Sequence, residues 1–339
     1  MKKIRSLALA GLFALFVTSA VAATIAENFT NNPSLDGWKT YGNTNLFQWD
    51  STNHNLLVAW DSSQLNSYFY HPLGATLNRT NNFMLAFDFR LNDIAIGTDP
   101  GYPSTFQVAI GLLNFAEATN AGFVIGTGYQ APDLLELDYF PAFADTHHHY
   151  SASVSTPIIS SDNNFAAGGF TVPLAFSPGA RYHAIMIYTA DNQTLHTALS
   201  SNDVPVGPMQ DTTLYSGFGD FNVDTISINS YSDAGQDTSV HTNLDGSTVI
   251  YAGSVLAHGV VNSLFFANPL PVTQVLATGP GNVQFASTTN WLYTLERTTN
   301  FQTWTAVSPS TPGSAGTMMV SDTNALSAKA FYRIRADQP

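Results

Sequence analysis

Cysteine is absent from the 339-residue sequence. This absence excludes disulfide bonds, thiolate metal sites, a catalytic cysteine and a lipoprotein anchor. Charged residues are also scarce, at 10% of the chain, and the 24 acids outnumber the 11 Lys and Arg residues to give a formal net charge of −13. Because an acidic surface repels phosphate groups, nucleic acid and anionic lipid are poor partners for this protein.

The first 22 residues have the three parts of a secretory signal peptide. A basic start (residues 1–5) precedes an apolar run (residues 7–17), and Ala20-Val21-Ala22 forms a small-residue exit. The apolar run is shorter than the roughly 20 residues that a membrane-spanning helix needs. We expect cleavage after Ala22 and a secreted or cell-surface protein, with a charge of −16 because the removed segment holds three cations and no acid.

Strand patterns recur along the rest of the chain, and no long stretch with a helical period competes with them. Residues 83–91 are the clearest case, since Phe and Leu occupy every odd position. Loops rich in Asn, Gly, Pro and Asp separate the segments. The pattern predicts an all-β protein of two large antiparallel sheets packed face to face. The other predicted strands are residues 55–60, 106–112, 135–140, 182–189, 193–199, 223–230 and 260–267.

A proline-punctuated stretch, NPLPV at residues 268–272, divides the chain. We predict a large domain over residues 23–268, a linker over 269–275 and a small β-sandwich, fibronectin III-like, over 276–339. Within the small domain, residues 291–297 alternate cleanly, and residues 330–335 form a closing strand.

Residues 134–150, LLELDYFPAFADTHHHY, gather acids and imidazoles among aromatic rings. Glu136 and Asp138 stand two positions apart on a predicted strand, so both project to one face. Pro141 ends the strand, and the chain beyond it can fold back to bring Asp145 and the histidines 147–149 toward the acids. Carboxylate and imidazole ligands suit Mn, Ca or Zn. We expect these groups to converge at a sheet edge, near rings able to hold a saccharide.

The order of the segments resembles the concanavalin A-like lectin and glucanase jelly roll, a group that includes laminin-G-like domains. The resemblance rests on the opening Leu35-Asp36-Gly37-Trp38, on the strand at 223–228, and on a last strand at 258–266 that returns beside the first. It covers roughly residues 24–268 and implies a jelly-roll sandwich for the large domain.

The resemblance also implies a metal site. Lectins of this group hold a Mn and Ca pair with a Glu-x-Asp-x-aromatic-x-Asn strand, followed by an Asp and a His. Glu136, Asp138, Asp145 and His149 (or His148) fall in matching order. Ala142 stands where the Asn would be and the loop is short, so a single Ca or Mn ion is the implied cofactor.

Three rings complete this first hypothesis, which is non-catalytic recognition of a polysaccharide or cell-surface glycan. Tyr129, Phe143 and Tyr150 lie close to the acids in sequence and offer faces on which a pyranose can stack. The metal would fix the loop that meets the sugar.

A second hypothesis is glycoside hydrolysis. Glucanases of this fold use Glu-x-Asp-x-x-Glu on one strand, and here Glu136 and Asp138 would be the catalytic residues. Pro141 occupies the place of the second Glu and cannot donate a proton, so the two carboxyl groups of a retaining enzyme are incomplete.

A third hypothesis is a structural or adhesive surface protein that makes protein contacts. Glu136 and Asp138 would then lie on a solvated strand face, and Asp224 would be a turn or strand-end residue. Residues 293–304 and 331–335, YTLERTTNFQTW and FYRIR, resemble small C-terminal modules of secreted proteins from Gram-negative environmental bacteria. That resemblance implies a docking, export or spacing role.

Overall fold

The computed structural model describes most of the chain after the predicted signal peptide, whose residues 1–22 lie outside it. Across the described residues no helix is long or apolar enough to cross a membrane. The described residues are 23–96, 108–123, 131–144, 149–150, 152–154, 158–162, 166–167, 172–207, 211–232, 241–242, 248–249, 255–268, 272–279, 281–289, 291–299, 303–314, 316–325 and 330–337.

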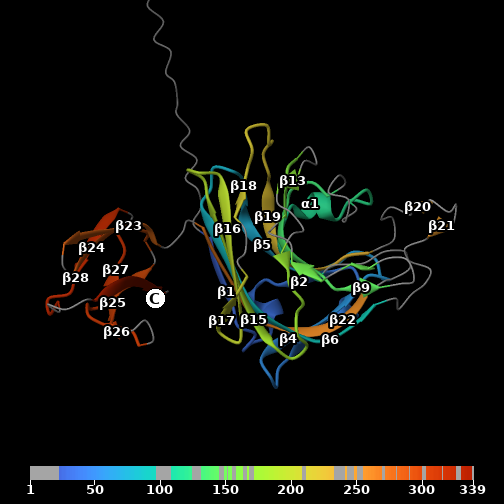
Figure 1. Ribbon diagram of the computed structural model, residues 1–339, viewed down its shortest axis with the longest axis horizontal. Helices are drawn as coiled ribbons and strands as arrows, with labels where there is room; N and C mark the ends of the chain where they lie inside the picture. Colours follow the sequence, from blue (N-terminus) through green and yellow to red (C-terminus); the bar gives the residue numbers. More distant parts are fainter. Residues whose placement is uncertain are drawn as a thin grey trace, which may run out of the picture.

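Two nine-stranded antiparallel sheets form the large domain, which confirms the predicted all-β jelly-roll sandwich (Figure 1). The first sheet has the order β17-β16-β15-β6-β22-β4-β3, with β1 beside β22 and β18 beside β16. Its strands are β1 (Ala23–Glu27), β3 (Phe47–Asp50), β4 (Asn55–Asp61), β6 (Phe83–Ile96), β15 (Arg181–Thr189), β16 (Thr194–Ser201), β17 (Val204–Val206), β18 (Thr212–Thr213) and β22 (Val255–Asn268).

The second sheet has the order β13-β12-β8-β7-β19-β5-β2, and β11 joins β8 and β14. Its strands are β2 (Lys39–Tyr41), β5 (Ser67–Leu77), β7 (Val108–Leu113), β8 (Leu134–Phe140), β11 (Ser153–Val154), β12 (Ile158–Ser160), β13 (Ala166–Ala167), β14 (Val172–Pro173) and β19 (Val223–Ser230). The remaining elements of this domain are η1 (Pro33–Asp36), η2 (Thr44–Leu46), α1 (Phe115–Ala118) and two ladders, β9 (Phe143–Ala144) with β10 (His149–Tyr150) and β20 (His241–Thr242) with β21 (Thr248–Val249).

The core lies between the two sheets and is filled by the apolar positions of the alternating strands. The odd residues of β6 from Phe83 to Leu91 are at most 1% exposed, as the alternation predicted. The last five residues of β22, the predicted last strand, pair with all of β1, so the end of the domain returns beside its beginning. The strand at 182–189 runs between β16 and β6, and only one of its faces is fully buried.

The C-terminal residues form two further sheets around a separate small core. One sheet has the order β23-β24-β28 and the other β26-β25-β27, with β29 beside β25. β23 begins at Val272, so it includes the later part of the predicted linker 269–275. The strands are β23 (Val272–Gly279), β24 (Asn282–Ser287), β25 (Leu292–Thr298), β26 (Thr305–Ala306), β27 (Thr311–Pro312), β28 (Thr317–Ser321) and β29 (Phe331–Asp337).

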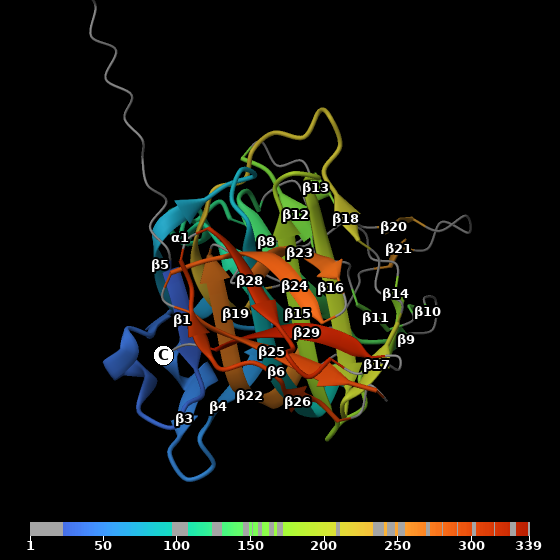
Figure 2. The ribbon, with the colours of Figure 1, turned by 90° about the vertical axis from the view of Figure 1, so that its left-hand side faces the viewer.

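This C-terminal unit lies against the first sheet of the large domain (Figures 1 and 2). Phe265 of β22 contacts Trp291 edge to face, with ring centroids 5.9 Å apart. Phe265 and Ala267 thereby belong to the small core that Phe285 and Tyr293 fill. The outer face of the second sheet is therefore on the opposite side of the sandwich from the C-terminal unit.

Candidate functional site

The two acids of β8 share one face of the second sheet. Leu135, Leu137 and Tyr139 belong to the sandwich core, and the Tyr139 ring stacks on Phe176 at 4.1 Å. Because side chains alternate along a strand, Glu136 and Asp138 point to the outer face. β8 is an interior strand between β7 and the pair β11 and β12, so the expected sheet-edge position is wrong.

Both carboxylates are fully buried on that outer face. Glu136 and Asp138 are 0% exposed. The interpretation that they lie on a solvated strand face is therefore wrong. Loss of hydration makes ionised carboxylates costly unless a proton, hydrogen bonds or a cation compensates.

Glu136 has partners from the far side of β7. Asn229 Nδ2 donates to Glu136 Oε2 at 2.8 Å, and the Tyr231 hydroxyl donates to the same oxygen at 2.9 Å. Gly111 of β7 lies opposite Glu136, and Ala109 lies opposite Asp138. These two small residues leave room above β7 for side chains from β8 and β19 to meet.

Burial perturbs the titration of all three groups in this cluster. Desolvation raises the pKa of Glu136 to about 7, against the hydrogen bonds from Tyr231 and Asn229, which lower it. Desolvation is the largest cause that raises the pKa of Asp138 well above its ordinary value, and the charge of the neighbouring Glu136 raises it further. Burial likewise raises the pKa of the Tyr231 hydroxyl. Without a cation, the acid pair thus retains a proton at neutral pH.

The donor set at Glu136 fits a hard cation. Glu136 Oε1 and Asn229 Oδ1 are buried and, apart from the contact between the Glu136 and Asp138 carboxyl groups, carry no hydrogen bond within the described part of the chain. Oxygen donors of this kind suit Ca or Mn. Among the described residues, no group of three or more His, Asp or Glu side chains is close enough to form a metal site by itself.

The other predicted ligands follow β8 in the chain. After Pro141 the backbone turns back, because His149 pairs with Ala144 in the β9–β10 ladder. Ser153 of β11 then pairs with Phe140 at the end of β8. The fold-back predicted beyond the proline is thus present in the backbone. Asp145, His147, His148 and Tyr129 lie outside the described residues, as do the side chains of Phe143, His149 and Tyr150.

The sequence interpretation missed Asn229, Tyr231 and Gly111. Ser227 and Asn229 are the polar positions of the alternating strand 223–230, so their placement on the outer face could have been predicted. Their meeting with β8 depends on the strand order β8-β7-β19, which no local pattern specifies.

Comparison with solved structures finds lectins. A complex of peanut lectin with a nine-residue peptide is 14% identical and covers 75% of this chain and 100% of the lectin, with a TM-score of 0.42. A lectin from Bauhinia forficata in complex with GalNAc is 13% identical, with coverages of 73% and 98% and a TM-score of 0.39. Winged bean acidic lectin complexed with methyl-alpha-D-galactose is 10% identical, with the same coverages and a TM-score of 0.41. No protein-family model and no curated protein sequence matches the chain.

Proposed function

We propose that this protein is a secreted, non-catalytic carbohydrate-binding protein of the lectin type, braced by a divalent cation. The observation that carries the proposal is the buried acid pair Glu136 and Asp138 on the outer face of the second sheet. A desolvated pair of this kind has two stable forms, one that shares a proton and one that holds a cation.

Ca or Mn would be held by Glu136 and Asp138, with Asp145 and His149 as the remaining ligands. The cation would neutralise the carboxylates and fix the chain that leaves β8. Asn229 and Tyr231 hold the Glu136 carboxylate in place through Oε2, which leaves Oε1 for the cation. The rings of Tyr129, Phe143 and Tyr150 are the proposed contacts for a pyranose.

The geometry favours this role over hydrolysis. A retaining glycosidase needs two carboxyl groups that flank the scissile bond and reach it from solvent. Glu136 and Asp138 are fully buried, and Pro141 stands where the acid/base glutamate of the glucanases would be. These features support a structural role for the two acids, in which they hold a cation that fixes the chain after β8.

A second candidate function, adhesion through protein contacts, draws support from the C-terminal unit. Leu276, Gln284 and Met319 lie in one cross-strand row, and the two apolar members are 59% and 66% exposed. An exposed apolar row on a sheet face is a typical feature of a protein-binding surface.

Metal analysis and glycan binding test the main proposal. We expect the purified mature chain to contain close to one equivalent of Ca or Mn by elemental analysis. Removing the metal with a chelator, or the Asp138→Asn substitution, should weaken binding on a glycan array by at least about 10-fold, because the braced loop loses its fixed shape. The Asp93→Asn variant removes the same charge at an exposed position and should bind like the parent.

Two results would count against the proposal. Glycan binding that survives chelation and Asp138→Asn would rule out the cation. Binding to cell-envelope proteins that no sugar competes away, with no binding on the array, would favour the adhesion function instead.

A further inference from the structure

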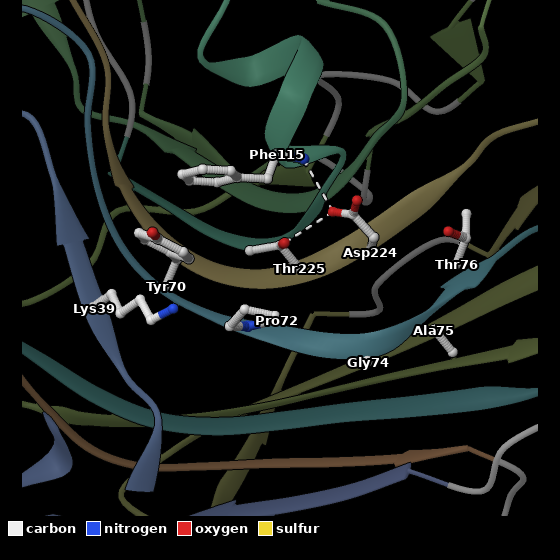
Figure 3. A pocket seen from close by; sticks show the side chains of 9 residues that line it. All are labelled: Lys39, Tyr70, Pro72, Gly74, Ala75, Thr76, Phe115, Asp224 and Thr225. Atoms are coloured by element: carbon white, nitrogen blue, oxygen red, sulfur yellow. Dashed lines mark hydrogen bonds between the residues drawn. The ribbon is translucent and has the colours of Figure 1, made fainter. Parts of the chain in front are cut away.

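A cavity separate from the buried acid pair opens at the other end of the outer face of the second sheet. Its volume is about 450 Å³, within the range of small-ligand sites. Asp224 lies five residues before Asn229 on β19, which places it about 16 Å along the strand from the Glu136 cluster. Figure 3 shows the residues that line the cavity, among them Lys39, Tyr70, Pro72, Phe115, Asp224 and Thr225.

An irregularity in β5 creates this cavity. Thr225 pairs with Pro72, whereas Val223 pairs with Leu77, so β5 has extra residues opposite Asp224. Gly74 has a φ of 73° at this bulge, a left-handed conformation that glycine adopts without strain. The Asp224 side chain consequently points into the opening (Figure 3).

Some polar groups of the cavity already make hydrogen bonds within the protein, and others do not. Asp224 Oδ1 accepts hydrogen bonds from the Phe115 amide at 3.0 Å and from the Thr225 hydroxyl at 2.8 Å. Within the described part of the chain, Asp224 Oδ2 carries no hydrogen bond and Lys39 makes no salt bridge. An acceptor on Asp224 and a donor on Lys39 are thus among the groups that line the cavity, with Tyr70 and Pro72 between them (Figure 3).

Aromatic rings form one wall between these two groups. The rings of Tyr70 and Phe115 stack with centroids 4.2 Å apart and an interplanar angle of 27°. Together with Pro72 they give an apolar surface that suits the C–H groups of a ring-shaped ligand. The fixed carboxylate, the single cation and the apolar wall match a molecule that has many hydroxyls and no net charge.

We propose that this cavity binds one neutral sugar residue of a glycan. Sugar hydroxyls would donate to Asp224 Oδ2 and accept from the Lys39 ammonium, while the pyranose C–H groups would contact the wall formed by the stacked Tyr70 and Phe115 rings. This inference rests on the proposed carbohydrate-binding function and adds a subsite that needs no cation.

Calorimetric titration with neutral hexasaccharides tests the subsite. The probes are maltohexaose, cellohexaose and laminarihexaose, titrated into the mature full-length chain. Asp224→Asn keeps the Oδ1 acceptor for Phe115 and Thr225 but replaces the free acceptor with an amide donor. We expect it to weaken the tightest-binding probe by about 10-fold or more, since hydrogen bonds to charged groups are the stronger ones. Asp203→Asn changes an exposed side chain between β16 and β17, in the first sheet, and should change the affinity less than about two-fold.

The outcomes separate this site from the cation site. The subsite is supported if Asp224→Asn weakens binding with and without a chelator while Asp138→Asn binds like the parent. The same result would overturn the proposed cation site. Loss in Asp138→Asn with Asp224→Asn within about two-fold of the parent overturns the subsite and leaves the proposed function standing. If no hexasaccharide binds, the subsite proposal is wrong.

Discussion

In metal-free buffer at pH 8, the Glu136→Gln variant should be more stable than the parent protein. A folded-state pKa of about 7 against 4.5 for the exposed group corresponds to about 3 kcal/mol of unfolding free energy once Glu136 is ionised. Gln keeps an oxygen to accept from Asn229 and Tyr231, carries no charge, and can donate its amide to the neighbouring carboxyl group.

The pH dependence has a defined sign. Below about pH 4.5, both the folded and the unfolded chain carry the Glu136 proton, and stability does not depend on it. Between about pH 4.5 and 7 only the folded chain keeps the proton, so stability falls by about 1.4 kcal/mol for each pH unit. Above about pH 7 both states are ionised, and the loss is complete. The raised pKa of Asp138 extends the decline to higher pH.

Urea unfolding at pH 5 and pH 8, with and without Ca or Mn, measures these differences. The parent should lose stability from pH 5 to pH 8 in metal-free buffer and recover it on addition of the cation, because the cation binds the ionised pair. Glu136→Gln should lose less stability than the parent between pH 5 and pH 8, because only the decline due to the buried Asp138 remains, and it should recover less on addition of the cation. Glu117→Gln makes the same chemical change on an exposed side chain and should behave like the parent. A parent whose stability rises from pH 5 to pH 8 without metal would contradict the prediction.

Alternation in the sequence was sufficient to assign β8 and its two faces, although it did not reveal β5 (Ser67–Leu77). Leu135, Leu137 and Tyr139 point into the core, and the two acids point away from it, because a strand has a strict period of two. Pro141 ends β8 for the reason predicted, since proline lacks the amide that would continue the ladder.

Burial of the acids could not be predicted from these local patterns. Glu136 contacts Asn229 and Tyr231, which are 93 and 95 residues further along the chain. Part of the outer face is covered by residues from α1 onward, where the Ala118 carbonyl accepts from Tyr68 and the Phe123 ring lies 6.2 Å from Tyr231. Exposure of a strand face depends on such long-range packing, so alternation alone favoured the solvated interpretation.

The surroundings of Asp224 also could not be predicted from the sequence, for a different reason. Asp224 is the second residue of β19, which confirms the prediction of a strand-end residue, and its carboxylate also accepts from the Phe115 amide where α1 begins. The cavity beside it arises from the bulge in β5, a strand 150 residues away in sequence whose extra residues leave no periodic signature. A bulge can be recognised only after the strand pairing is known.

Gly111→Ala should be the most damaging single substitution at the candidate site. A Cβ atom on Gly111 would overlap the Cβ of Glu136 and the carbonyl oxygen of Leu135. Backbone atoms of β8 cannot rotate away as a side chain can, so β7 and β8 would have to separate. We expect a loss of at least about 3 kcal/mol in unfolding free energy, at the upper end of overpacking effects.

The separation of β7 and β8 would also displace Glu136 from Asn229 and Tyr231. We therefore expect the variant to lose the stabilisation by added cation as well as part of its unfolding free energy. Gly217→Ala is the matched control, since its Cβ would meet only the Tyr215 ring, at 3.6 Å, an ordinary contact. Urea unfolding followed by tryptophan fluorescence compares the two variants, and soluble yield reports a chain that fails to fold. If Gly111→Ala unfolds within about 0.5 kcal/mol of the parent and still responds to Ca or Mn, the close approach of β7 to β8 does not position the acid pair.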